Sequence, residues 1–166
     1  MDIYCIDTSS LIDMKEKYPK DIFSGLWKRI DELCKNERLI APIEVKKEIE
    51  KGDDELKKWA RDKLRKRMFK KPDKNQVEKV QETLKNYPFL SKSDKPDEPN
   101  ADPWLIALAI VKNEEERGKF EHMRNKYIVI SEESPTKPNR IPAVCRNFGI
   151  ECISLIDFFR REGWKF

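Results

Sequence analysis

Two short hydrophobic segments, one near each end of the chain, have the pattern of buried parallel strands. Residues 2–7 (DIYCID) and 126–131 (KYIVIS) are mostly apolar, and each segment ends in a polar side chain. Nearly uninterrupted apolar runs of this length are typical of strands that helices cover on both faces. Weaker strand patterns occur at 38–42 (RLIAP) and at 150–155 (IECISL), the second of which follows Gly149. We predict that all four segments are strands.

Helical patterns fill most of the chain between these strands. We predict helices over about 20–36, 42–51, 53–70, 74–87, 102–117, 141–148 and 155–162. In the third of these, apolar residues recur at every fourth position and form one stripe on a charged helix, namely Leu56, Ala60, Leu64 and Met68. Two proline-rich segments, 88–103 and 134–142, have the composition of loops. Strands that alternate with helices predict an α/β fold with a parallel sheet covered on both faces.

The length and composition fit one globular domain spanning residues 1–166. A chain of 166 residues falls in the usual range for a single domain. Its longest apolar run, at 104–111, has eight residues, whereas about 20 are needed to cross a bilayer. The first residues lack the basic start and long apolar stretch of a signal peptide. We therefore predict a cytoplasmic protein with no membrane contact.

The four cysteines fit buried free thiols better than a metal site. They form no C-x-x-C pair, and His122 is the only histidine, which argues against structural zinc. Thiols are normally kept reduced in the cytosol. Cys145 and Cys152 could still meet across a turn, but a buried thiol is the commoner state of such residues.

Acidic side chains recur near the ends of the predicted strands. Because ligands of doubly wound sheets bind beyond the carboxyl ends of the strands, these acids are candidates for one site. Clustered carboxylates repel one another unless a cation neutralises them, and oxygen ligands suit Mg²⁺ or Mn²⁺. Such a cation activates water for in-line attack on a phosphodiester. The candidate acids are Asp7, Glu48, Asp102, Glu132 and Glu133.

Each acid alone also fits a structural role. Asp102 followed by Pro103 is a common start of a helix, with the Asp capping the first amides. Asp7 could cap a short helix begun by SSLIDM, and single glutamates such as Glu48 and Glu133 are usually solvated. Only their joint arrangement favours a functional site.

Several motifs together resemble a known family. They are YCIDTSSLID at 4–13, APIEVKKEIEKG at 41–52, ADPWLIALA at 101–109, YIVISEE at 127–133 and the tail at 141–164. In these segments the sequence resembles the PIN-domain nucleases, the superfamily that includes the VapC-type toxins. It is most similar to a poorly characterised group within that superfamily.

The resemblance assigns roles to particular residues of this chain. The first catalytic Asp of the family falls on Asp7, and a small hydroxyl residue falls on Ser9. The conserved Glu falls on Glu48, and the Asp that opens an Ala-rich helix falls on Asp102. In the family's scheme these acids hold Mg²⁺ or Mn²⁺, and a metal-bound water attacks the phosphorus.

The fourth acid of the family departs from the usual pattern. It is commonly an Asp two residues after a Ser or Thr, and that spacing from Ser131 falls on Glu133, with Glu132 as an alternative. The resemblance further implies a three-layer α/β/α sandwich, cleavage of RNA and, in the toxin branch, a homodimer silenced by an antitoxin protein.

A basic segment between Leu56 and Lys74 provides a separate argument about the substrate. It holds ten Lys and Arg residues against two Asp, while the whole chain carries a net charge of only +4. Such a segment would bind a polyanion in a salt-dependent way, although a merely solvated face fits equally well. Trp59 and Phe69 could stack on bases, or lie in the core. The predicted nucleic-acid contacts are Lys57, Lys58, Arg61, Arg65, Lys66, Arg67, Lys70 and Lys71.

These observations lead to one main functional hypothesis and three alternatives. The main hypothesis is a metal-dependent ribonuclease, the toxin of a type II toxin–antitoxin pair. The second is a PIN-like module without catalysis that binds RNA or protein, which the Glu at the fourth position favours. A phosphatase with an Asp nucleophile would need a second Asp where Ser9 stands. A DNA nuclease with the same acids also stays open, because nothing in the sequence recognises a 2′-hydroxyl.

Overall fold

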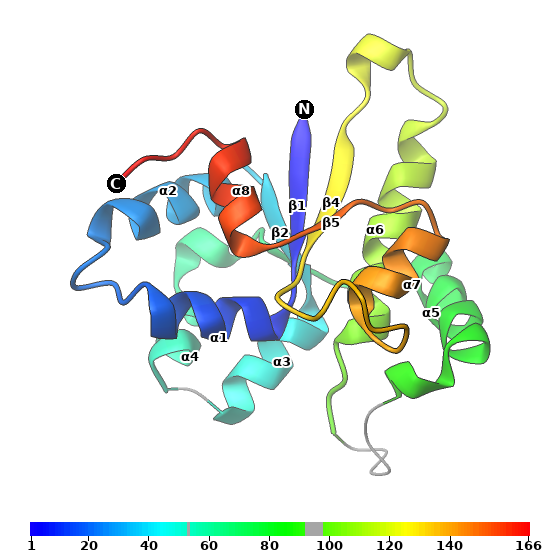
Figure 1. The fold of residues 1–166 in the computed structure, drawn as a ribbon, viewed down its shortest axis with the longest axis horizontal. Coiled ribbons are helices and arrows are strands. Elements are labelled where there is room, and N and C mark those ends of the chain that lie inside the picture. Colours follow the sequence, from blue (N-terminus) through cyan, green and yellow to red (C-terminus); the bar gives the residue numbers. More distant parts are fainter. Residues whose placement is uncertain (53, 92–97) are drawn as a thin grey trace.

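A parallel β-sheet forms the centre of the computed structural model, which describes residues 1–52, 54–91 and 98–166 (Figure 1). Within these residues the sheet has five strands in the order β3-β2-β1-β4-β5, and every neighbouring pair is parallel. The strands are β1 (Asp2–Ile6), β2 (Leu39–Pro42), β3 (Phe69–Lys70), β4 (Lys126–Ile130) and β5 (Cys152–Ile153). The predicted α/β class and parallel sheet are therefore confirmed.

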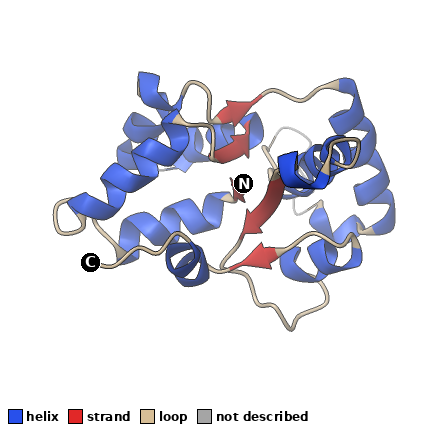
Figure 2. Ribbon diagram, turned by 90° about the horizontal axis from the view of Figure 1, so that it is seen from above, coloured by secondary structure: helices blue, strands red, loops and turns tan. Residues whose placement is uncertain are grey.

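Helices cover both faces of this sheet, so the chain forms the three-layer α/β/α sandwich that the resemblance implies (Figure 2). The first face packs against α1 (Thr8–Lys17), α2 (Ser24–Lys35), α3 (Ile43–Gly52), α4 (Asp54–Arg61) and α8 (Leu155–Arg161). The second face packs against α5 (Lys74–Asn86), α6 (Asp102–Glu116) and α7 (Ile141–Asn147). Short 3₁₀ helices occur at η1 (Lys63–Arg65), η2 (Pro88–Leu90) and η3 (Glu121–Met123).

Alternation along β1 explains why the molecule has two cores. Tyr4 and Ile6 lie in the core beneath α1, α2 and α8, whereas Ile3 and Cys5 lie in the core beneath α6 and α7. Successive side chains of a strand point to opposite faces, so an apolar run such as IYCI is buried on both sides. The sequence pattern of β1 thus places it in the middle of the sheet, where both faces are covered.

The segment 53–70 differs from its prediction. Helix α4 ends at Arg61, a 3₁₀ turn follows, and the chain then enters the edge strand β3, which the sequence analysis missed. Asp62 caps the 3₁₀ turn by accepting a hydrogen bond from the Leu64 amide at 2.9 Å. Leu64, predicted to be part of the apolar stripe, is therefore 45% exposed, while Leu56, Ala60 and Met68 are buried.

The remaining predicted elements agree with the structure within a few residues. All four predicted strands are present, with the last shortened to two residues. Helix α2 begins at Ser24 rather than near residue 20, and the chain before it forms α1 directly after β1. The predicted loop at 88–103 contains the 3₁₀ turn η2, and its residues 92–97 lie outside the described part. The predicted loop at 134–142 ends at the start of α7.

The order of the strands places a switch point between β1 and β4 at the carboxyl ends of the strands. β1 pairs with β2 on one side and with β4 on the other. After β1 the chain enters α1 on the first face, whereas after β4 it enters α7 on the second face. Such a switch point, at the carboxyl ends of the strands, is where open α/β sheets bind ligands. Asp7 follows β1 and Ser131 follows β4 at this edge, and both are buried.

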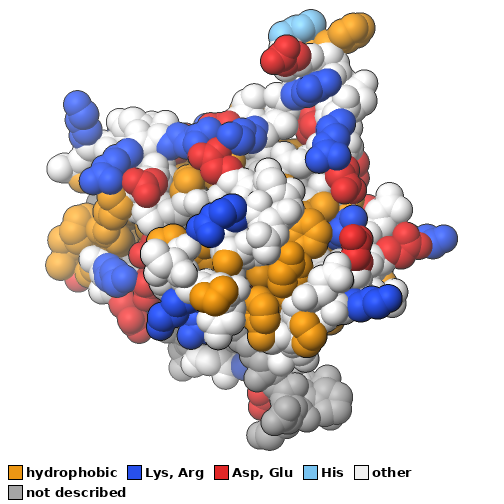
Figure 3. All heavy atoms as spheres, turned by 45° about the vertical axis from the view of Figure 1, so that its right-hand side comes forward, with side chains coloured by type: hydrophobic (Ala, Val, Ile, Leu, Met, Phe, Trp, Pro, Cys, Tyr) orange, Lys and Arg blue, Asp and Glu red, His pale blue; other side chains and the backbone are white. Residues whose placement is uncertain are grey.

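The surface of the second face is mixed in character (Figure 3). Lys and Arg side chains alternate there with Asp and Glu, around a central group of hydrophobic side chains. The segment between α6 and β4 projects beyond the sheet and carries Phe120 and Met123, which are 76% and 60% exposed. All four cysteines are free thiols, and three of them are buried. None of the helices in the described residues is long and apolar enough to cross a membrane.

Candidate functional site

Asp7 lies buried at the point where β1 passes into α1. It is the N-cap of α1, and its Oδ1 accepts a hydrogen bond from the Ser10 amide at 2.6 Å. The hydroxyl of Ser9 donates to Oδ2 at 3.1 Å. Burial raises the pKa of Asp7 to about 6, although hydrogen bonds from Ser10, Ser131 and Ser9 partly oppose this shift. The carboxylate is thus both a helix cap and a buried acid that is costly to ionise.

Glu48 of α3 binds a chain neighbour of Asp7 and a chain neighbour of Asp102. One carboxylate oxygen accepts a hydrogen bond from the Thr8 hydroxyl, and the other accepts one from the Ala101 amide at 2.6 Å. Thr8 is the residue after Asp7, and Ala101 is the residue before Asp102. Glu48 therefore connects the start of α1 with the start of α6, although Ala101 lies 53 residues after Glu48 in the chain.

Asp102 is the first residue of α6 and does not occupy the cap position. The cap residue is Ala101, whose side chain has no oxygen, and a proline follows within the first turn. The Oδ2 atom of Asp102 is buried. The structural alternative, in which Asp102 is the cap residue of this helix, is thus wrong, and its carboxylate lies at the helix start beside the residue that Glu48 binds.

Glu132 and Glu133 bind the amino ends of two other helices. Oε1 of Glu132 accepts a hydrogen bond from the Leu155 amide at 2.6 Å, at the start of α8. Oε2 of Glu133 accepts one from the Ile141 amide at 2.8 Å, at the start of α7. The Glu133 amide in turn donates to the Ser131 hydroxyl at 3.3 Å. Both acids thus have structural partners near the edge where Asp7 lies.

The donor set at this edge suits a hard divalent cation. Asp7, Glu48 and Asp102 supply carboxylate oxygens, and Ser9 adds a hydroxyl, which are ligands that Mg²⁺ and Mn²⁺ accept. In the described residues, however, no three Asp, Glu, His or Cys side chains are positioned to hold one metal ion. The side chains of Asp7 and Glu48 instead satisfy amides and hydroxyls of the neighbouring helix starts.

The basic segment divides into exposed side chains and one buried arginine. The guanidinium of Arg65 forms an ion pair with Asp31, contacts Asp62 at 3.3 Å and stacks over the Trp59 ring at 4.7 Å. Its side chain is only 3% exposed, so Arg65 is unavailable to a nucleic acid and that prediction is wrong. Burial of a cation is tolerated here because two carboxylates and a ring compensate it.

The other predicted cationic contacts remain on the surface or half-buried. Three of them form ion pairs: Arg61 with Glu50, and both Arg67 and Lys70 with Glu37. The side chains of Lys58, Lys66 and Lys71 are exposed, and Lys57 is half-buried.

The two aromatic side chains of the basic segment belong to the core. Trp59 and Phe69 are each 8% exposed. Trp59 packs edge-on against Trp27, and its indole N–H donates to Asp31 at 3.2 Å. Phe69 lies in β3 beneath the ammonium of Lys46. Stacking of these rings on bases is therefore excluded in this conformation, in agreement with the core interpretation.

Sequence reasoning missed one residue that organises the site. Thr8 is not among the residues that the sequence analysis singled out, yet its hydroxyl is the group that binds Glu48. The signal was the run Thr8, Ser9 and Ser10 itself, because three hydroxyls after a strand-ending acid can orient more than one carboxylate.

Comparison with known proteins gives one match. The sequence model of a family with the description "Domain of unknown function (DUF4411)" matches residues 4–166, almost the whole chain. No curated protein and no solved structure matches it.

Proposed function

The chain belongs to the family of domains of unknown function DUF4411, and from its own site we propose that it is a metal-dependent ribonuclease. RNA is the proposed substrate, and Mg²⁺ or Mn²⁺ is the proposed cofactor. The resemblance to PIN-domain toxins extends the proposal to a toxin role, with an antitoxin protein as a partner and a homodimer as the assembly.

One observation carries this proposal. The Glu48 carboxylate binds Thr8 and Ala101, the chain neighbours of Asp7 and Asp102, and so ties α3 to the start of α1 and the start of α6. The nearby Asp7 is buried, and burial of a carboxylate makes its ionisation costly. A divalent cation removes that cost, and the raised pKa of Asp7 fits an acid that needs a cation to ionise.

Asp7, Glu48 and Asp102 would hold the metal in this proposal. When bound, the metal would lower the pKa of a water molecule and stabilise the charge that develops on the phosphate. Ser9 keeps the Asp7 carboxylate oriented through its hydrogen bond to Oδ2. Thr8 does the same for Glu48, so two hydroxyls of the α1 start fix the two acids before any ligand arrives.

The exposed lysines supply the affinity for a polyanion. Lys58, Lys66 and Lys71 are exposed, and each can neutralise one phosphate of a flexible strand. Binding through such contacts does not depend on sequence and weakens as salt concentration rises.

The decisive experiment measures cleavage of a labelled RNA pool by the whole chain with Mg²⁺, Mn²⁺ or EDTA. The test variant is Glu48→Gln, which keeps the size of the side chain and removes its charge. The matched control is Glu50→Gln on the same helix, where Glu50 is paired only with Arg61 at 3.2 Å among the contacts described above. We expect the test variant to lose cleavage by about a hundredfold or more, with the control unchanged. Equal cleavage by both variants would refute the proposed site.

The second candidate is a binding module of the same fold without catalysis. Glu132 and Glu133 favour this candidate, because each accepts a hydrogen bond from an amide at a helix start, which leaves fewer acids for a metal. This candidate predicts salt-sensitive RNA binding that EDTA and Mn²⁺ do not change, together with no cleavage. Retained RNA binding in Glu48→Gln with no cleavage by the parent protein would favour it.

A further inference from the structure

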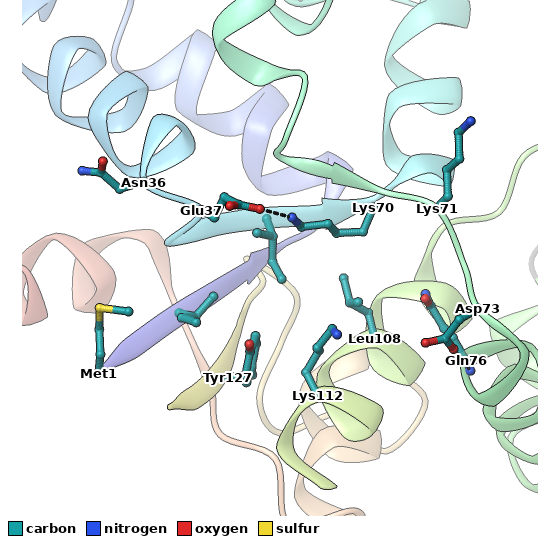
Figure 4. Close-up of a pocket in the computed structure, with 12 residues that line it drawn as sticks. Met1, Asn36, Glu37, Lys70, Lys71, Asp73, Gln76, Leu108, Lys112 and Tyr127 are labelled. Atoms are coloured by element: carbon teal, nitrogen blue, oxygen red, sulfur yellow. Dashed lines mark hydrogen bonds and ion pairs between the residues drawn. The ribbon is translucent and has the colours of Figure 1, made fainter. Parts of the chain in front are cut away.

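The structure contains a cavity of about 410 Å³ on the face of the sheet beneath α6, away from the candidate acids. Its floor is apolar and is formed by Ile3 of β1, Ile40 of β2 and Leu108 of α6 (Figure 4). The cavity reaches Tyr127 at the amino end of β4. Ser131 lies four residues further along this strand, about 13 Å at the usual rise. The cavity and the acids are thus separate places on the same sheet.

Two lysines approach this cavity from opposite walls. Lys70 of β3 forms an ion pair with Glu37 at 2.6 Å, and Lys112 of α6 forms one with Glu115 at 2.9 Å. Both side chains are partly buried, at 29% and 31% exposure. An ammonium has three N–H donors, so each lysine can bind an anionic ligand while keeping its carboxylate partner. Lys71 also lines the cavity, but its side chain points away from the other two (Figure 4).

Tyr127 adds a neutral donor on the same side of the cavity as Lys112. Figure 4 shows Tyr127 and Lys112 across the cavity from the Glu37–Lys70 pair. The Asn113 side chain fixes the base of this tyrosine, since it accepts from the Tyr127 amide at 3.0 Å and donates to the Tyr127 carbonyl at 2.9 Å. Burial and nearby carboxylates raise the pKa of Tyr127 to about 12, so its hydroxyl keeps its proton.

The chemistry of the walls selects one class of ligand. Two ammonium groups and a phenol that line the cavity suit a phosphate, because charge-assisted hydrogen bonds to phosphate are strong. The apolar floor suits a flat ring, and the Glu37 carboxylate can accept a hydrogen bond from an amino group on that ring. The volume lies in the range of small-molecule sites, about 300 to 1,000 Å³. We propose that this cavity binds a nucleoside monophosphate.

Calorimetric titration of the whole chain tests this proposal. The probes are the four ribonucleoside 5′-monophosphates, inorganic phosphate and adenosine. All titrations contain EDTA, so that a metal at the candidate acids does not contribute and the outcome is independent of the proposed nuclease activity. We expect at least one nucleotide to bind about tenfold more tightly than phosphate or adenosine, because only the nucleotide uses both the polar walls and the apolar floor.

Three variants locate the binding. Lys112→Met removes the charge and keeps the aliphatic stem, and Tyr127→Phe removes only the hydroxyl. We expect each to weaken nucleotide binding, by about tenfold and about fivefold respectively. The matched control is Lys79→Met on α5. Lys79 forms an ion pair with Glu82 at 2.8 Å, and the two residues have the same three-residue spacing as Lys112 and Glu115. It should leave binding unchanged, and thermal melts of all variants monitor folding.

Several results would overturn the proposal. The first is absence of nucleotide binding at millimolar concentration. The second is phosphate binding as tightly as any nucleotide, which would make the cavity a simple anion site. The third is unchanged binding in both Lys112→Met and Tyr127→Phe, which would place the nucleotide elsewhere.

Discussion

Replacing Asp7 by Asn tests how much the buried carboxylate at the end of β1 lowers the free energy of unfolding. The substitution keeps the size of the side chain and an oxygen that can accept the hydrogen bond from the Ser10 amide. It removes the ionisable group, whose pKa is raised by burial from 3.8 to about 6. The helix cap therefore survives while the cost of a buried charge disappears.

The size and sign of the effect follow from this pKa. Below pH 3.8 Asp7 is protonated in both the folded and the unfolded chain, and it contributes no difference. Between pH 3.8 and about 6 the unfolded chain loses this proton first, so the stability of the parent falls as pH rises. Above this window the cost is constant, and a shift of about two units corresponds to about 3 kcal/mol.

Urea denaturation between pH 4 and 8 measures this difference directly. We expect Asp7→Asn to become more stable than the parent as pH rises, by up to about 3 kcal/mol at pH 7. The control is Asp73→Asn, because Asp73 caps α5 through the Gln76 amide at 2.8 Å in the same way but is exposed. The control should change stability by less than about 0.5 kcal/mol at every pH.

Two outcomes would contradict the reasoning. If Asp7→Asn were less stable than the parent at pH 7, Asp7 would be stabilising as a carboxylate, and burial would not dominate its energetics. If the two proteins differed equally at pH 4 and pH 8, ionisation would not be the cause. Repeating the series with Mn²⁺ adds a link to function, since a metal held by ionised Asp7 should stabilise the parent and leave the variant unchanged.

Three further predictions concern residues outside the central acids. Arg65→Met should destabilise the fold by about 2 kcal/mol in urea denaturation, because it leaves the Asp31 carboxylate without its buried partner. Lys66→Met should leave stability unchanged but reduce the salt dependence of RNA binding by about one phosphate contact, measured by filter binding at several salt concentrations. Glu133→Ala should cost about 1 kcal/mol in the same denaturation assay, because the Ile141 amide at the start of α7 loses its acceptor.

Most of the fold could be predicted because its signals are local. The buried strands are short apolar runs, and α6 combines such a run with a proline in its first turn. The prediction of one helix over 53–70 failed because the helical spacing of apolar residues continues past Arg61, where α4 ends. Asp62 caps a new turn there, and buried Arg65 is held by Asp31 of α2, a contact that no local pattern reveals. Tertiary contacts overrode helical periodicity at this place.

The candidate site could be predicted only in part. The acids that follow strands or open helices were identifiable from position, because the carboxyl ends of parallel strands meet at one edge. The sequence did not reveal that Glu48 links two helix starts, because its partners Thr8 and Ala101 lie 40 and 53 residues away in the chain. The sequence also could not distinguish Arg65 from its exposed basic neighbours, because burial depends on the packing of α2 against the 3₁₀ turn.

The structure explains why Glu rather than Asp stands at position 133. The resemblance leads us to expect Asp here, yet the Glu133 carboxylate reaches across a loop to the Ile141 amide, eight residues later. Asp is one methylene shorter, so it would reach that amide only if the loop moved closer. Because Glu132 similarly binds the start of α8, both acids that follow β4 contribute to holding helices in place. A metal site at this edge would then depend on Asp7, Glu48 and Asp102, with water completing its coordination, as Mg²⁺ commonly allows.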